Sequence, residues 1–289
     1  MYRRHEWRRQ RFTLALTGVL RRQQGHAARI SVKALMNEIR PTSLTTGSPA
    51  RSIAVCMREG KKPGLFWLGG LKSDMKGTKA QALDHWAETA GRACVRFDYS
   101  GHGESSGQFT EGTIGRWLED SLAVYAHFAR GPQIVIGSSM GGWLALLLAR
   151  ELAEQKGAAP IAGMVLIAPA VDFTEELMWK QFSETTKSEI DQKGIWLRPS
   201  AYGEEPYPIT RALIEDGRKY LLLGGLIETR CPVHILQGVQ DPDVPWRHAV
   251  ELVSRFSRDD VVLTLIKDGD HRLSRPEDIE RLIMAVKEF

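Results

Sequence analysis

The chain has 289 residues, of which 43% are hydrophobic and 26% charged, the composition of an ordinary globular enzyme. Its length suffices for one large α/β domain with a sizeable core. No apolar run approaches the roughly 20 residues that a transmembrane helix needs, and the apolar run at residues 12–20 has no small-residue cleavage site after it. We therefore expect neither stable membrane insertion nor a secretory signal.

The charge is distributed unevenly along the chain. Residues 1–35 contain nine Lys or Arg and one acid, a charge of +8, so the remainder of this +4 chain carries −4. An acidic body does not indicate a nucleic-acid surface. The basic segment has three interpretations: an organelle presequence, an amphipathic membrane-surface segment, or extra sequence before a later start at Met36. Its few serines fit a presequence poorly, so we favour the third interpretation.

This interpretation divides the chain into a basic extension, residues 1–35, outside the fold, and one domain over residues 36–289. A cytoplasmic location follows from it, and a mitochondrial location is the alternative if the Arg-rich segment is a presequence.

Beyond the extension, short apolar runs alternate with helical stretches. The predicted strands are residues 52–57, 64–68, 93–97, 133–136, 161–167, 233–237 and 261–266. The predicted helices are residues 80–89, 114–129, 143–149, 245–257 and 276–289. Alternating strands and helices indicate a mostly parallel sheet with helices on both faces. Ligands of such sheets bind at the carboxyl ends of the strands.

Residues 171–230 interrupt the alternation. The segment is too long for a loop without structure of its own, so we expect a small helical lid over the site. Its aromatic side chains could line a pocket or serve only packing, and both roles stay open. They are Trp179, Phe182, Trp196, Tyr202, Tyr207 and Tyr220.

Ser139 lies at the centre of the motif Gly137-Ser138-Ser139-Met140-Gly141, between a predicted strand and a predicted helix. The pattern G-x-S-x-G in this context is typical of a nucleophile elbow, a tight turn that exposes a reactive serine. The alternative is a glycine-rich turn with an idle serine. We predict Ser139 as the nucleophile.

A serine nucleophile needs an imidazole to take its proton and a carboxylate to orient that imidazole. Elbow hydrolases place them in the chain order serine, acid, histidine. Asp241 follows the strand at 233–237 and is preferred to Asp243, and His271 follows the strand at 261–266. We interpret Asp270 as a turn or cap residue. The other histidines suit structural or solvated roles, or precede the serine: His5, His26, His85, His102, His127, His234 and His248.

An oxyanion hole requires two backbone donors. Met140 N–H supplies one by its position after the nucleophile, and Leu71 N–H is the simplest second donor, after the strand at 64–68. We interpret residues 98–105, with Gly101 and Gly103, as a structural turn.

The three cysteines are interpreted as buried hydrophobic residues of a protein in a reducing compartment. They are Cys56, Cys94 and Cys231. Their spacing indicates no metal site.

These features resemble the α/β-hydrolase superfamily over residues 52–289. Several stretches are similar to the mitochondrial palmitoyl-protein thioesterase and acyl-glucuronide esterase group and its bacterial relatives. They are residues 71–80 (LKSDMKGTKA), 96–101 (RFDYSG), 137–143 (GSSMGGW), 243–246 (DVPW) and 270–272 (DHR). The resemblance implies Ser139 as nucleophile, Asp241 as acid and His271 as base. It also implies cleavage of acyl esters or thioesters, in small molecules or acylated proteins, without a metal or organic cofactor.

Two other functions stay open at this point. An aminopeptidase-like enzyme of the same fold would need acids in the lid to hold a substrate amine, and residues 175–176 and 204–205 offer glutamate pairs. Solvated faces explain these pairs more simply. A binding protein on a hydrolase scaffold is the second alternative, because fold alone does not prove activity. The sequence does not indicate an oligomeric state.

Overall fold

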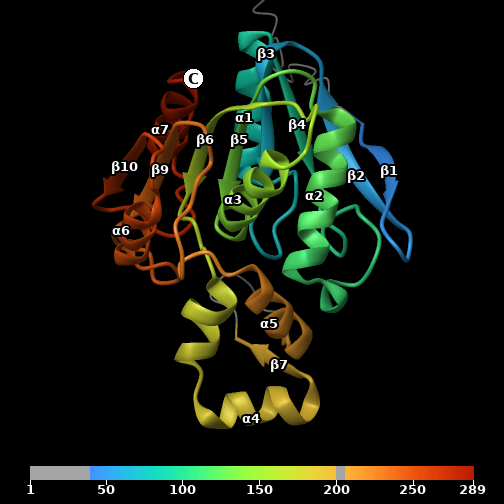
Figure 1. The fold of residues 1–289 in the computed structure, drawn as a ribbon, viewed down its shortest axis with the longest axis vertical. Helices are drawn as coiled ribbons and strands as arrows, with labels where there is room; N and C mark the ends of the chain where they lie inside the picture. The colour runs from blue at the N-terminus through green and yellow to red at the C-terminus, as the bar shows by residue number, and fades with distance from the viewer. Residues whose placement is uncertain (1–39, 200–205) are drawn as a thin grey trace, which may run out of the picture. The chain divides into compact units, whose positions relative to one another are not determined.

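An eight-stranded sheet with the strand order β1-β2-β4-β3-β5-β6-β9-β10 forms the centre of the computed structural model, which describes residues 40–199 and 206–289 (Figure 1). Both the basic extension and the boundary predicted at residues 35 and 36 lie outside the described residues. The strands are β1 Thr42–Thr46, β2 Arg51–Arg58, β3 Lys61–Leu68, β4 Arg92–Phe97, β5 Gln133–Ser138, β6 Ile161–Ile167, β9 Val233–Gly238 and β10 Val261–Ile266.

Each of the seven predicted strands is present, and the sheet is mostly parallel as expected. The exception is its first edge, where β1 pairs antiparallel with β2 and β2 pairs antiparallel with β4. A parallel pair needs a long crossover, and only four residues separate β1 from β2. From β4 onward the neighbouring strands are parallel.

Helices cover both faces of the sheet, as Figure 1 shows. Helices α1 (Thr78–Ala90) and α7 (Pro276–Lys287) contact each other and share one apolar cluster with the sheet. On the opposite face lie α2 (Ile114–Phe128), α3 (Met140–Ala153) and α6 (Trp246–Arg255). None of the helices in the described part of the chain is both long and apolar enough to span a membrane.

The central strands are apolar at successive positions because both of their faces are buried. In β3, Leu65 and Trp67 belong to the cluster with α1 and α7, whereas Phe66 and Leu68 belong to the cluster with α2 and α3. Alternate side chains of one strand therefore fill the two separate cores. The carboxyl ends of the strands lie at the edge of the sheet, where the loops after β3, β5, β9 and β10 begin.

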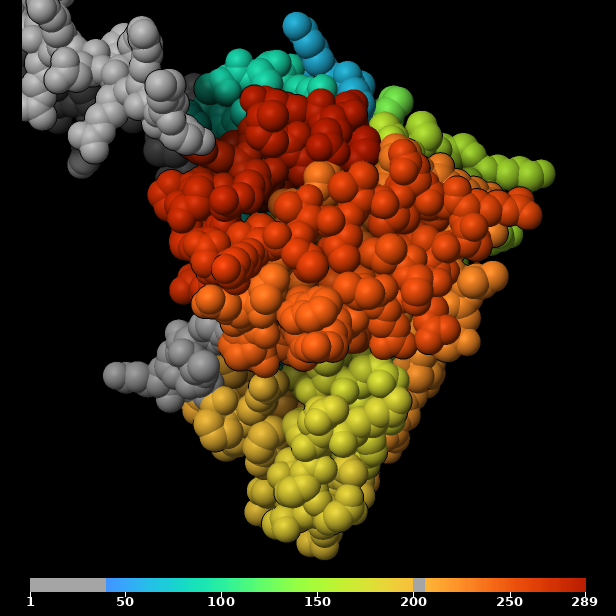
Figure 2. All heavy atoms as spheres, turned by 90° about the vertical axis from the view of Figure 1, so that its left-hand side faces the viewer, coloured from blue at the N-terminus to red at the C-terminus, as the bar shows by residue number. Residues whose placement is uncertain are grey.

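The segment predicted as a lid contains helices and also a β-hairpin. Its larger elements are α4 Glu184–Lys193, β7 Ile195–Arg198, β8 Tyr207–Thr210 and α5 Arg211–Gly217, preceded by two short helical turns, η2 Thr174–Met178 and η3 Trp179–Gln181, and followed by a third, η4 Arg218–Tyr220. Strands β7 and β8 pair antiparallel. Figure 2 shows the yellow part of this segment packed directly below the orange elements that include α6. Accordingly, His248 of α6 hydrogen-bonds through Nε2 to the carbonyl of Val171.

Candidate active site

Ser139 lies in the turn between β5 and α3, in a backbone conformation that L residues seldom adopt, with φ 55° and ψ −120°. Its N–H donates to the carbonyl of Ile167 at 2.8 Å, which ties the turn to β6. A Cβ added at Gly141 would lie 2.1 Å from the carbonyl oxygen of Leu68. The motif glycine is therefore required by the close approach of α3 to β3, and the turn holds Ser139 at the carboxyl edge of the sheet.

His271 lies between Ser139 and Asp241. Its Nε2 is 3.0 Å from Ser139 Oγ, and its Nδ1 is 2.8 Å from Asp241 Oδ2. The loops after β9 and β10 carry these two side chains, and they approach closely: Gln240 N–H donates to the carbonyl of Gly269 at 2.9 Å. The structure thus brings the three predicted triad residues into one hydrogen-bonded series.

Asp241 is buried, and its other contacts fix its orientation. Its Oδ1 accepts the N–H groups of Asp243 and Val244, each at 2.8 Å, and its Oδ2 also accepts from Gln237 Nε2 at 3.2 Å. Both carboxylate oxygens therefore have donors in addition to the imidazole. Such a network holds one carboxylate orientation and thereby sets which imidazole nitrogen carries the proton.

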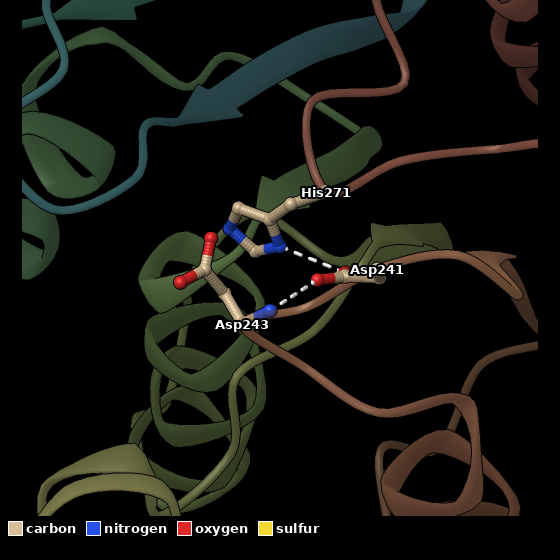
Figure 3. A group of neighbouring side chains, drawn as sticks. All are labelled: Asp241, Asp243 and His271. Carbon is tan, nitrogen blue, oxygen red and sulfur yellow. Dashed lines mark hydrogen bonds and ion pairs between the residues drawn. The ribbon is translucent and has the colours of Figure 1, made fainter. Parts of the chain in front are cut away.

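Asp243, the second candidate for the acid, lies on the other side of the imidazole from the Nδ1 contact, as Figure 3 shows. It forms an ion pair with Arg198 of β7 at 3.7 Å. Asp241, Asp243 and His271 each offer one atom that could bind a metal ion, and these three atoms lie within 4.8 Å of one another. The imidazole nitrogens, however, face Asp241 and Ser139. Hydrogen bonds therefore account for the positions of Asp241 and His271, and the Asp243 carboxylate pairs with Arg198.

The loop after β3 approaches Ser139 from the neighbouring strand. A Cβ added at Gly70 would lie 3.4 Å from Ser139 Cβ, and Leu71 lines the same pocket as Ser139. Met140 is the first residue of α3, so its N–H belongs to the helix-end donors that have no partner within the helix. The two predicted oxyanion donors thus lie on the two segments that flank the nucleophile, beside the positive end of the α3 dipole.

A cavity of about 380 Å³ opens beside Ser139. Its apolar wall includes lid residues that the sequence did not single out: Phe173, Leu177, Met178 and Ile209. Of the predicted lid aromatics in the described residues, Tyr207 lines this cavity. The others pack within the fold, as when Phe182 contacts Trp196 at 5.0 Å between ring centroids. Tyr202 lies outside the described residues.

Lys79 of α1 holds the loop that carries His271. Its Nζ donates to the carbonyl of Arg272 and lies 3.3 Å from Ser274 Oγ. Burial, together with the charge of Arg272, lowers the pKa of Lys79 to about 8. A partly buried lysine that hydrogen-bonds next to His271 restrains this loop, and no sequence pattern indicated the contact.

The other titratable residues considered in the sequence analysis are either exposed to solvent or have structural contacts. His85 and His127 are exposed, and His234 lies between Glu288 and Thr264. Asp270 accepts the N–H of Leu273 at 2.9 Å and is the expected turn residue. The three cysteines are buried and are present as thiols: Cys56, Cys94 and Cys231.

The turn after β4 is structural, as predicted. Gly101 and Gly103 have positive φ angles of 74° and 46°. Asp98 accepts the N–H groups of Met75 and Glu104 at 2.6 Å and 2.8 Å, which joins this turn to the loop that precedes α1. The same turn places His102 in the interior, 4% exposed.

Burial lowers the pKa of His102 to about 4, so folding disfavours its protonated form. A histidine whose folded pKa lies below its unfolded value of about 6.5 loses stability as the pH falls from about 6.5 through 4. We expect the free energy of unfolding to fall by about 3 kcal/mol more in the wild type than in His102→Gln over this range. Urea unfolding of both proteins at pH 7 and pH 4 measures the difference, and parallel pH dependence would contradict the prediction.

The strand order, the turn at Ser139 and the loops that carry Asp241 and His271 define an α/β-hydrolase fold. The chain belongs to the alpha/beta hydrolase family, whose sequence model matches residues 63–282. It is 38% identical to the mitochondrial palmitoyl-protein thioesterase ABHD10 of Bos taurus over 232 residues, 80% of this chain and 74% of the relative.

Two solved structures are similar over most of the chain. A putative hydrolase from Agrobacterium vitis has 50% sequence identity and a TM-score of 0.84, and the match covers 86% of this chain and 98% of that one. Mouse alpha/beta hydrolase domain-containing protein 10 has 35% identity and a TM-score of 0.77, with coverage of 86% and 97%.

Proposed function

We propose that this protein is a serine hydrolase that cleaves carboxylic ester or thioester bonds of acyl substrates. The observation that carries the proposal is the hydrogen-bonded series Asp241–His271–Ser139, with distances of 2.8 Å and 3.0 Å. Kinship with a palmitoyl-protein thioesterase, and similarity to a putative bacterial hydrolase, support the same reaction class.

In the first half of the reaction, Ser139 Oγ attacks the acyl carbon while His271 Nε2 takes the hydroxyl proton. Asp241 accepts the Nδ1–H of His271 and stabilises the imidazolium that forms. Negative charge develops on the acyl oxygen, and the N–H groups of Met140 and Leu71 bind it. His271 then gives its proton to the departing alcohol or thiol, which leaves an acyl group on Ser139.

In the second half, water takes the place of the leaving group. His271 Nε2 accepts a proton from the water, whose oxygen attacks the acyl carbon of the ester on Ser139. The oxyanion donors act a second time, and the proton returns to Ser139 Oγ as the carboxylic acid departs. The residues that act are the same in both steps, so no further group is needed for turnover.

The acyl chain occupies the apolar wall of the cavity in this proposal, against Phe173, Leu177, Met178 and Ile209. The substrate is then an acylated protein or a small acyl ester, in keeping with the thioesterase name of the relatives. These relatives are also named as mitochondrial, which fits the mitochondrial alternative for the location of this protein. Residues 1–35, for which a presequence is one interpretation, lie outside the described residues.

The aminopeptidase-like alternative gains no support from the lid acids in the described residues. Glu175 hydrogen-bonds to Arg218 at 2.8 Å, and Glu176 hydrogen-bonds to Lys180. Both carboxylates are therefore neutralised by neighbours rather than presented to a substrate amine. The second pair, residues 204–205, lies outside the described residues.

Hydrolysis of matched oxygen esters and thioesters of graded chain length tests the proposed function. We expect turnover that rises with chain length until the cavity is filled, together with labelling of Ser139 by a fluorophosphonate probe. Labelling without turnover of any of these substrates would show a competent site and a wrong substrate class. If the folded protein neither hydrolysed these substrates nor reacted with the probe, a binding protein on the hydrolase scaffold would be favoured.

A further inference from the structure

We propose that His102 is a positioning residue of the oxyanion hole: its imidazole holds the loop that presents the Leu71 N–H to the substrate. The inference rests on the proposed function, since an oxyanion hole matters only to acyl transfer. His102 lies in the structural turn after β4 and precedes the nucleophile in the chain, so it has no place in the triad.

The direct contact is a hydrogen bond from the backbone of the oxyanion loop. The N–H of Lys72 donates to His102 Nε2 at 3.0 Å. Lys72 has a φ of 56°, an unfavourable conformation for a side-chain-bearing residue, which requires support from its surroundings. The bond fixes the peptide between Leu71 and Lys72, next to the Leu71 N–H. A neutral imidazole is needed, because only an unprotonated Nε2 accepts a hydrogen bond.

The opposite edge of the imidazole is anchored to the body of the fold. With Nε2 as acceptor, Nδ1 carries the proton and donates to the carbonyl of Ser100 at 3.3 Å. That carbonyl also accepts from Trp117 Nε1 at 3.1 Å. Ser100 donates through its N–H and Oγ to Asp120 at 2.9 Å and 2.7 Å. Asp120 in turn accepts from Arg51 Nε at 2.8 Å. The series connects β2 and α2 to the oxyanion loop.

Aromatic packing limits the imidazole to this orientation. The rings of Tyr99, Phe109 and Trp117 surround it, with centroids at 5.6 Å, 5.2 Å and 5.2 Å. His102 is not among the residues that line the cavity beside Ser139. It therefore acts through the backbone of the loop and does not contact substrate. This separation allows a test in which substrate binding and transition-state binding respond differently.

Three substitutions at His102 separate positioning from packing. Phenylalanine keeps an aromatic ring and removes the acceptor, asparagine is polar but too short to reach Lys72, and glutamine can place its amide oxygen near the position of Nε2. We expect His102→Phe and His102→Asn to lower kcat by about 10- to 100-fold with KM within about 2-fold of the wild type. His102→Gln is expected to recover activity to within about 5-fold of the wild type.

Affinity for a trifluoromethyl ketone, whose adduct with Ser139 carries an oxyanion, is the second measurement. Positioning predicts that this affinity falls in proportion to kcat, with active enzyme counted by fluorophosphonate titration. A merely structural role would lower stability but leave kcat and ketone affinity per active site unchanged, and that result in either His102→Phe or His102→Asn would overturn the inference. Failure of the proposed function is distinguishable, because the wild type would then hydrolyse no ester or thioester.

Discussion

Replacing Ser139 with alanine is expected to lower kcat/KM for an acyl ester by roughly 10,000- to 1,000,000-fold. The methyl group keeps the turn and the contacts of the backbone, so the expected loss comes from chemistry. Without Oγ no acyl-enzyme forms, and the imidazole 3.0 Å from that atom has no proton to take. Residual hydrolysis would then depend on water and on the oxyanion donors. Initial rates at high enzyme concentration measure the difference.

Ser138, the other serine of the motif, gives the matched control for Ser139→Ala. It ends β5 and is buried, at 6% exposure, whereas Ser139 is half-buried beside His271. Ser138→Ala also removes one serine hydroxyl, at the position next to Ser139. This substitution is expected to change kcat/KM by less than about 5-fold. If Ser139→Ala retained more than about 1% of wild-type activity with unchanged folding, Ser139 would not be the nucleophile and the proposed mechanism would be wrong.

The sequence predicted the central strands and the location of the site because both depend on local patterns. Strands such as β5 and β6 are buried on both faces, so they appear as short continuous apolar runs between turn residues. The elbow was visible because its backbone has no room for a side chain at Gly141. Asp241 and His271 could be found by chain order, since each follows a strand that ends at the same edge of the sheet.

Features that depend on contacts between distant segments could not be predicted in this way. Strand β1 (Thr42–Thr46) is short and mostly exposed, so it lacks an apolar run. The hairpin of β7 and β8 has four residues in each strand, too few for a periodicity. Likewise, the bond from Lys72 to His102 spans 30 residues, and no motif in the sequence pairs these two positions.

The acid of the triad is tested by Asp241→Asn, which we expect to lower kcat by roughly 10,000-fold and to change KM little. The N–H groups of Asp243 and Val244 point at one oxygen of this carboxylate, so the amide oxygen of asparagine will occupy that position. Its NH₂ group must then face His271 Nδ1 and donate to it. This contact places the imidazole proton on Nε2, which can no longer accept the proton of Ser139.

The same substitution at the neighbouring acid is the matched comparison. Asp243→Asn keeps the shape of the side chain and removes the charge that pairs with Arg198, a half-exposed ion pair of 3.7 Å. We expect kcat to fall by less than about 10-fold, because His271 Nδ1 keeps its partner, Asp241. Steady-state kinetics of both variants decide between the two acids. A large loss in Asp243→Asn with near wild-type activity in Asp241→Asn would assign the acid to Asp243, and the tautomer argument would be wrong.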